Sequence, residues 1–214
     1  GVYKRALSIK SDYVDVYNNM GNVLREQGKS EEAVEAYSKA IEFKPDFNEA
    51  YRNIGIALKG IVFKSSNSNL DKNIIPLLDK QSYVRPIDIS YAIISLLKFE
   101  EKLQKQLQLV HAGTVRENFK ESIVKLIELP LLLKLMCVCP LPDIDLEKLL
   151  RDLRASLLSY ILSFKALPEA LEFQSALALQ CFTNEYVYNH SKDEEKAIKV
   201  LEKEVEKSFR NNQQ

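Results

Sequence analysis

Glycine is scarce in this chain and forms no cluster. The 214 residues contain six glycines, at positions 1, 21, 28, 55, 60 and 113. Cofactor-binding α/β folds need a glycine-rich loop between a strand and a helix. No segment alternates apolar and polar residues as a half-buried strand does. These two absences predict an all-α fold without a cofactor loop of this kind.

Neither sign of charge is in excess, and the apolar runs are short. The chain carries 30 basic and 30 acidic residues, so its formal net charge is zero. A protein that binds nucleic acid by electrostatics shows a basic excess or stripe. The apolar stretch around residues 129–138 is too short for a membrane span and contains Lys134. We therefore expect neither nucleic acid nor a membrane as a partner.

Cysteine and histidine are also few. The three cysteines, Cys137, Cys139 and Cys181, are an odd number within apolar stretches, which favours buried thiols in a reducing, cytoplasmic compartment. Cys137 and Cys139 lack the second pair that a zinc site needs. His111 and His190 have no cysteine or acidic partner at metal spacing, so we interpret both as surface or loop residues. We expect no metal and no cofactor.

One segment, residues 14–47, has small and large residues at fixed spacing. These positions are Tyr17, Met20, Gly21, Leu24, Ala33, Tyr37, Ala40 and Pro45. Gly21 and Ala33 are small enough to let two antiparallel helices approach closely, and Pro45 ends the second because it cannot donate a backbone hydrogen bond. The segment resembles one unit of the tetratricopeptide repeat family. That resemblance implies a helical scaffold that binds proteins or peptides and seldom catalyses a reaction.

The turn between the two predicted helices contains residues suited to capping. Gly28 is placed to end the first helix in the left-handed conformation that glycine adopts without strain. Ser30 stands at the start of the second helix, where its hydroxyl can accept a hydrogen bond from a free backbone amide. We therefore expect Gly28 and Ser30 to cap the two helices.

The same pattern continues one tetratricopeptide period later, where Tyr17 maps onto Tyr51 and Gly21 onto Gly55. It also continues one period earlier, where Tyr37 maps onto Tyr3. The predicted divisions are a partial repeat (1–13), a complete repeat (14–47) and the first helix of the next (48–64), together the repeat region 1–64.

The first predicted helix lacks its partner helix in this sequence. Tyr3, Ala6 and Leu7 would leave apolar surface bare at the edge of the array. We therefore expect further repeats before Gly1 and self-association through the exposed repeat edge.

Beyond residue 64 the repeat pattern fails. Asn67 and Asp71 stand where the repeat needs a small residue and an aromatic. Residues 64–69 (KSSNSN) are polar and poor in helix formers, which predicts a loop. We place the boundary there, with an irregular α-helical domain over residues 65–214.

Apolar residues recur at helical spacing from about Pro86 to the end of the chain. Pro130 interrupts the pattern. The stripes are Leu96, Phe99, Leu103, Leu107 and Val110; Phe119, Ile123, Leu126 and Ile127; Leu146, Leu149, Leu150, Leu153, Leu157 and Ile161; and Ile198, Leu201, Val205 and Phe209.

Capping signals divide these helices. Asp143 or Asp145 can cap the helix that carries Leu146. Pro168 fits the first turn of the following helix, where a missing amide costs nothing. Ser191 and Glu194 have the spacing of a capping box at the start of the last helix.

The acidic group Asp143, Asp145 and Glu147 has a second interpretation as a cation site. It lacks the glycine and the distant glutamate of a calcium loop, so capping at the positive end of a helix dipole explains it better. No nucleophile, base or metal constellation occurs elsewhere in the sequence. We therefore expect that the chain is not an enzyme.

Two stretches of the second half have a further resemblance. They are LLLKLMCVCPLPDIDLEKLLRDLRASLLSYI (131–161) and FQSALALQCFTNEYVY (173–188). Together they resemble the helical region before the catalytic domain of bacterial tetratricopeptide–methyltransferase fusions. This resemblance implies an alternative function. The chain would be the targeting part of a larger S-adenosylmethionine-dependent methyltransferase, or of a glycosyltransferase, with its catalytic domain elsewhere.

The candidate binding residues lie on the first helices of the repeats. They are Asn18, Asn19, Asn22, Arg52 and Asn53. In tetratricopeptide arrays these helices line the concave groove, and the asparagines are similar to the ladder of O-GlcNAc transferase repeats, which holds a peptide backbone. A side-chain amide both donates and accepts hydrogen bonds, so it can pair with any peptide group. Two interpretations stay open: peptide binding, and a merely solvated face. Arg25, Arg52 and Lys59 could add contacts to an acidic partner.

Overall fold

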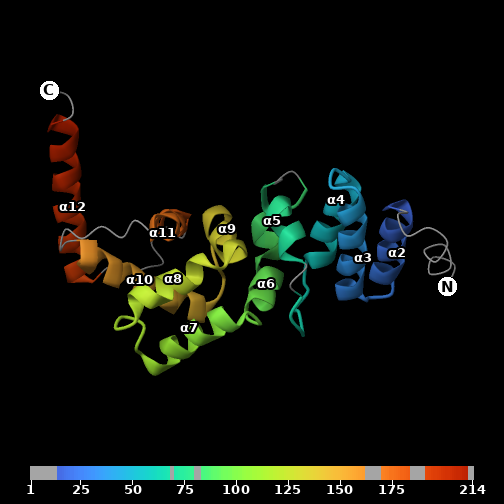
Figure 1. The fold of residues 1–214 in the computed structure, drawn as a ribbon, viewed down its shortest axis with the longest axis horizontal. Helices are drawn as coiled ribbons and strands as arrows, with labels where there is room; N and C mark the ends of the chain where they lie inside the picture. Colours follow the sequence, from blue (N-terminus) through green and yellow to red (C-terminus); the bar gives the residue numbers. More distant parts are fainter. Residues whose placement is uncertain (1–13, 68–69, 80–82, 162–169, 184–190, 212–214) are drawn as a thin grey trace. The chain divides into compact units, whose positions relative to one another are not determined.

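The computed structural model describes residues 14–67, 70–79, 83–161, 170–183 and 191–211. Within these ranges the chain forms eleven α-helices and no strand, which confirms the predicted all-α fold (Figure 1). None of the described helices is long and apolar enough to span a bilayer. They are α2 (Val14–Glu26), α3 (Ser30–Phe43), α4 (Asn48–Leu58), α5 (Asp71–Asp79), α6 (Pro86–Leu97), α7 (Glu101–Ala112), α8 (Phe119–Ile127), α9 (Pro130–Val138), α10 (Ile144–Ile161), α11 (Leu171–Thr183) and α12 (Lys192–Asn211).

The helices fall into two compact units, residues 1–100 and 101–214. Both α5 and α6 pack against α4, so the first unit extends past the predicted boundary at residue 64. The predicted loop is present where it is described, since residues 61–67 contain no helix. The Phe63 N–H in this loop donates to Ser95 Oγ of α6 over 3.0 Å. The loop therefore continues the first unit, and the compact unit ends later than the boundary placed from the repeat pattern.

α2 and α3 lie side by side (Figure 1), and Gly21 of α2 faces Tyr37 of α3. A Cβ placed on Gly21 would lie 2.4 Å from Tyr37 Cε1, much closer than any normal contact. Tyr37 and Ala33 are both fully buried. The predicted close approach is confirmed for Gly21, because any side chain there would displace the Tyr37 ring.

The turn from α2 to α3 confirms one predicted cap and contradicts the other. Gly28 has a φ of 75°, and the N–H of Lys29 donates to the Leu24 carbonyl over 2.9 Å, which is a Schellman ending of α2. α3 begins at Ser30 itself, with Lys29 in the capping position and no side-chain cap hydrogen bond. The prediction that Ser30 caps α3 is therefore wrong, because the tight turn brings Ser30 already into the helix. α3 ends at Phe43, before Pro45, as predicted.

After α4, a different segment replaces the second helix of a repeat. Gly55 of α4 lies against Val84, whose Cβ is 3.0 Å from a Cβ placed on Gly55. Tyr51 stacks on Tyr83 with ring centroids 6.3 Å apart. α6 follows this segment and also packs against α4. Val84 thus lies against the α4 glycine that corresponds to Gly21, at the place where a repeat would supply an aromatic residue.

In the second unit, α8 packs against four helices, α7, α9, α10 and α11. α10 packs against α7, α8 and α12, and α11 packs against α9 and α8. The predicted apolar stripe of α10 is confirmed over the described side chains. Its buried members are Leu146, Leu149, Leu150, Leu153 and Leu157.

The predicted stripe from Leu96 to Val110 does not lie on one helix. α6 ends at Leu97 and α7 begins at Glu101, with Phe99 in the intervening turn and 37% exposed. The N–H groups of Phe99 and Glu100 donate to carbonyls three residues earlier, which tightens and ends α6.

Pro130 is the first residue of α9, so it interrupts the helical pattern as predicted. Pro168, His190 and the side chains of Ile161, Val205 and Phe209 lie outside the described residues.

Candidate functional site

A hydrogen-bonded relay joins the first helices of the two successive repeats. Asn18 of α2 donates from Nδ2 to Glu49 Oε1 of α4 over 2.8 Å. Its own Oδ1 accepts a hydrogen bond from Asn53 Nδ2 over 2.9 Å. Asn18 is only 3% exposed, so its side-chain atoms in both hydrogen bonds are shielded from water. We call Asn18, Glu49 and Asn53 the Asn18 relay; it ties α2 to α4.

Asn22 also makes an interhelical contact. Its Oδ1 accepts a hydrogen bond from the Tyr37 hydroxyl over 2.9 Å. Burial raises the pKa of Tyr37, and the nearby Arg25 opposes this effect, so the hydroxyl stays protonated as a donor. Asn22 therefore helps to hold α3 against α2.

The remaining two candidate residues are exposed. Asn19 makes no side-chain hydrogen bond within the described part of the chain. The Arg52 guanidinium lies 5.6 Å from the centroid of the Tyr83 ring. Asn53 is half-buried and donates its side-chain amide to Asn18. A role of these residues in peptide binding stays a prediction.

The three basic residues that could contact an acidic partner, Arg25, Arg52 and Lys59, already contact other side chains of the first unit. Lys59 Nζ lies 3.0 Å from Asp88 Oδ2, and Arg85 contacts the other oxygen of Asp88 over 2.8 Å. Hydrogen bonds from Lys59 and then from Arg85 lower the pKa of Asp88. Arg25 lies beside Tyr37. Of the three predicted cations, Lys59 and Arg25 thus have partners within the unit, and Arg52 is stacked on Tyr83.

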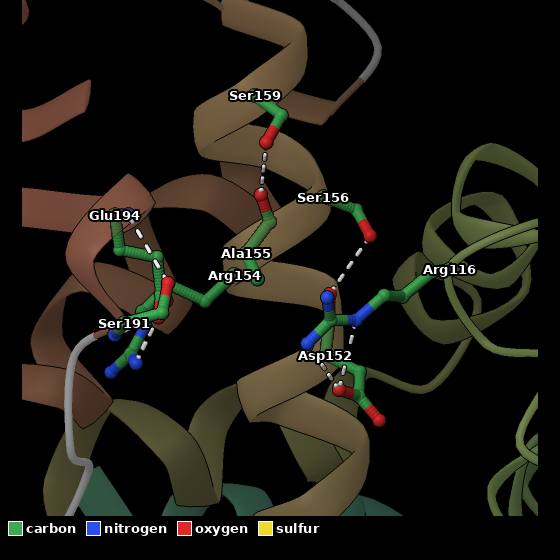
Figure 2. Close-up of polar contacts among 8 residues, drawn as sticks. All are labelled: Arg116, Asp152, Arg154, Ala155, Ser156, Ser159, Ser191 and Glu194. Carbon is green, nitrogen blue, oxygen red and sulfur yellow. Dashed lines mark hydrogen bonds and ion pairs between the residues drawn. The ribbon is translucent and has the colours of Figure 1, made fainter. Parts of the chain in front are cut away.

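A buried ion pair joins α10 to α12 in the second unit (Figure 2). Arg154 contacts Glu194 Oε1 through Nε at 3.0 Å and through Nη2 at 2.9 Å. The two side chains are 10% and 9% exposed. Glu194 Oε2 accepts from the Ser191 N–H over 2.8 Å, and the Glu194 N–H donates to Ser191 Oγ over 3.2 Å. The predicted capping box is confirmed, and its glutamate also anchors the helix.

The electrostatics of Glu194 follow from these contacts. Burial by itself would raise the pKa of this carboxyl. The hydrogen bond from the Ser191 amide and the charge of Arg154 outweigh burial, so the pKa lies below its usual value. Glu194 is therefore ionised in the folded protein at neutral pH, and its charge is compensated.

A cleft of about 490 Å³ lies beside this pair. Arg116 lines this cleft, and its Nη2 lies 3.2 Å from Asp152 Oδ1. Figure 2 shows this pair on the side of α10 opposite Glu194. Ser156 and Ser159 donate to the carbonyls of Asp152 and Ala155 in their own helix. The Ser156 and Ser159 hydroxyls are thus bonded within α10, and the guanidinium groups of Arg116 and Arg154 are paired with carboxylates.

The acidic group before α10 acts as a cap. Asp143 Oδ1 accepts hydrogen bonds from the N–H groups of Asp145 and Leu146 over 3.2 and 3.1 Å. Asp145 lies 3.5 Å from His111 Nε2, a contact that sequence spacing did not predict because folding brings α7 against α10. Within the described ranges, no group of three or more histidine, cysteine or acidic residues could hold a metal ion.

The three cysteines are free thiols. Cys139 is buried, and burial raises the pKa of its thiol to about 11. Cys137 and Cys181 are half-buried, and burial raises the pKa of both. Since the thiolate is the reactive form, these environments disfavour thiol chemistry.

Comparison with protein families identifies the first part of the chain. Residues 21–61 match the family described as TPR repeat, and residues 2–35 match the family described as Tetratricopeptide repeat. The residues that these two models match, 2–61 together, thus have the sequence pattern of tetratricopeptide repeats. No curated protein and no solved structure matches the chain. The matched tetratricopeptide segments lie within the first compact unit.

Sequence reasoning missed two residues of this tetratricopeptide surface. Glu49 accepts the hydrogen bond from Asn18, and Tyr83 stacks against Arg52 and Tyr51. Glu49 lies one period after Asp15, so the repeat frame itself indicated two acidic side chains at equivalent positions. Tyr83 follows the last position that the repeat pattern covers, and the sequence contains no signal for its contact.

Proposed function

We propose that this chain is a non-catalytic helical scaffold that binds a protein or peptide on the surface formed by α2 and α4. Tetratricopeptide repeats typically mediate protein–protein interactions, and this supports the proposal. The observation that carries it is the Asn18 relay, which ties α2 to α4 while Asn19 and Arg52 stay exposed. Because the helices are already held in place, binding of a partner does not have to order the backbone that carries these side chains.

The exposed groups of this surface suit an extended peptide. Asn19 offers an amide that can donate to and accept from a peptide bond. Asp15 and Glu49 are exposed carboxylates at equivalent positions of neighbouring repeats, and Arg52 supplies a cation. The surface thus combines main-chain recognition with charges of both signs. The alternative, a solvated face without a partner, predicts no preference for any peptide.

Selection of displayed random peptides on the whole chain tests this proposal. Peptides that are enriched are titrated against the wild type, the double variant Asn19→Ala with Arg52→Ala, and the control Glu42→Ala on the exposed side of α3. We expect a loss of about tenfold in affinity for the double variant, since each lost hydrogen bond is worth about 0.5–1.5 kcal/mol. The control should bind as the wild type does. Equal affinity of all three proteins would contradict the proposal.

A second proposal follows from the likeness of residues 131–161 and 173–188 to the region before the catalytic domain in methyltransferase fusions. The chain would then recruit substrates for a methyltransferase or glycosyltransferase domain encoded elsewhere in the same gene. Sequencing the gene beyond Gln214 tests it. A downstream strand, glycine-rich turn and acidic residue would support the proposal, and a stop codon at that point would contradict it.

A further inference from the structure

Two helices of the first unit expose apolar side chains around the ion pair that joins them. Ile56 of α4 is 48% exposed. On α6, Ile87 and Tyr91 lie one turn apart and are 41% and 64% exposed. Lys59, one turn after Ile56, lies 3.0 Å from Asp88, which directly follows Ile87. We call this region the α4–α6 surface; its residues are Ile56, Lys59, Arg85, Ile87, Asp88 and Tyr91.

The loop after α4 adds a further apolar side chain beside α6. Val62 in this loop is 66% exposed. The next residue, Phe63, is buried, and its N–H donates to the hydroxyl of Ser95, one turn beyond Tyr91 on α6. Single exposed apolar residues are ordinary on a protein surface, whereas a group of them marks an interaction site. Val62 and the three apolar residues of the α4–α6 surface form such a group.

The charge that this surface presents to solvent is positive. Lys59 and Arg85 both contact Asp88, at 3.0 and 2.8 Å. The side chains of the two cations are 50% and 79% exposed, whereas that of Asp88 is only 18% exposed. Because an ammonium has three N–H donors and a guanidinium has five, each cation keeps donors beyond those that it gives to Asp88. Two exposed cations thus share one largely covered carboxylate and can bind a second one.

The adjoining part of α4 carries charges of both signs. Arg52 lies one turn before Ile56 and adds a cation, and Glu49 lies one turn before Arg52. A carboxylate oxygen of Glu49 already accepts a hydrogen bond from Asn18. Together with the α4–α6 surface, this part of the unit has three cations and two carboxylates. The excess charge beside the exposed apolar side chains is therefore positive.

We propose that the α4–α6 surface binds an acidic segment of a partner protein that also carries apolar side chains. The carboxylates of this segment accept hydrogen bonds from Lys59 and Arg85, and its apolar side chains pack on Ile87 and Tyr91. A basic segment would be repelled, and a purely apolar one would cover the two cations without pairing them, which is costly. The inference rests on the proposed function, because α4 belongs to both surfaces. It adds that α6, which follows the matched repeats, selects the chemistry of the partner.

Titration of the whole chain with three short fluorescent peptides tests this chemistry. The first peptide alternates aspartate with leucine, the second has asparagine in place of each aspartate, and the third has alanine in place of each leucine. We expect the first to bind at least about fivefold more tightly than either of the others, as the gain of one charged or apolar contact does. Its advantage over the asparagine peptide should shrink at high salt, because ions screen exposed charges. Equal affinities, or no binding of the first peptide, would overturn the proposal.

Two variants of α6 residues show whether this surface causes the selectivity. Arg85→Gln should reduce the preference for aspartate over asparagine by about threefold or more, because it removes an exposed cation. Tyr91→Ser should reduce the preference for leucine over alanine to a similar extent, because it removes apolar contact area. Both side chains are exposed, so the melting temperature should stay unchanged.

Lys196→Gln is the matched control for Arg85→Gln. Lys196 is 76% exposed and pairs with a carboxylate three residues away, as Arg85 does, but it lies in the second unit. This variant should keep both preferences. An unchanged preference in either α6 variant would overturn this inference. The proposed function is tested separately, since its selected peptides should still depend on Asn19 and Arg52 in that case.

Discussion

Asn53 donates a hydrogen bond to Asn18 over 2.9 Å, and the two residues are 35 positions apart. This separation is one more than the repeat period of about 34 residues, so the bond joins positions that are not equivalent. One residue corresponds to a rotation of about 100° around a helix. Asn18 is therefore turned toward α4, whereas Asn19, the true equivalent of Asn53, stays exposed. The distinction separates the asparagines that hold the repeats together from the one that is free to bind.

Replacing Asn18 should destabilise the first unit. Asn18→Ala removes a partner from both Glu49 and Asn53, and one end of each bond is buried. We expect a loss of about 1–3 kcal/mol in the free energy of unfolding, measured by urea denaturation. The neighbouring Asn19→Ala should change it by less than about 0.5 kcal/mol. Similar stabilities of the two variants would mean that the relay contributes nothing.

A side chain at position 21 should be costly because of Tyr37. A Cβ on residue 21 would overlap the Tyr37 ring, so Gly21→Ala should force the ring to move. Overpacking of this kind costs about 1–3 kcal/mol. In a Tyr37→Leu background the same change should cost much less, since the obstructing ring is gone. A double-mutant cycle with no coupling between the two positions would contradict this description of the crossing.

The stability of the second unit should fall in acid through Glu194. The folded-state pKa of Glu194 lies below its ordinary value of 4.5, so its contribution is complete above that value and is lost as pH falls through the folded pKa. The protection factors of α12 amides, which correct for the pH dependence of intrinsic exchange, should therefore fall in this range. Glu194→Gln should exchange faster already at neutral pH, because Arg154 loses its buried partner, and should show a weaker acid dependence. An acid dependence equal to that of the wild type would assign the effect to other groups.

Cys139 should be inert in the folded protein. Burial raises the pKa of its thiol to about 11, so almost no thiolate exists near neutral pH. The double variant Cys137→Ala with Cys181→Ala leaves Cys139 as the single thiol. We expect its reaction with Ellman's reagent to be at least about a hundredfold slower than in urea. Rapid labelling at pH 7.5 under native conditions would show that the thiol is accessible.

The repeat could be predicted from sequence because its rules are local and steric. Gly21 requires a close approach, Gly28 requires a left-handed turn and Pro45 ends a helix; each acts within one or two turns of the chain. The capping box of Ser191 and Glu194 is local in the same sense. The prediction that Ser30 caps α3 failed because the helix begins one residue earlier than expected, so Ser30 takes the first helical position and Lys29 the capping position.

The remaining contacts depend on partners that are distant in sequence. No pattern links Val84 to Gly55 or Arg154 to Glu194, since these pairs form only when separate helices pack. The apolar residues around Phe99 keep helical spacing across the break between α6 and α7, so their periodicity alone did not reveal the break. The repeat frame placed the candidate residues on the helices that the structure shows as α2 and α4, but the division between structural and exposed asparagines required coordinates.

The proposed scaffold function is tested most directly by mapping where a selected peptide binds. Nuclear magnetic resonance titration of the whole chain with the tightest peptide should shift the side-chain amide of Asn19 and the backbone amides of Asn19, Arg52 and Asn53. Amides of α3 around Glu42, on an exposed part of another helix, should stay unchanged. The double variant Asn19→Ala with Arg52→Ala should lose the shifts on α4 at the same peptide concentration while its melting temperature is preserved. Shifts confined to the second unit, or undiminished shifts in the double variant, would contradict binding on the α2 and α4 surface.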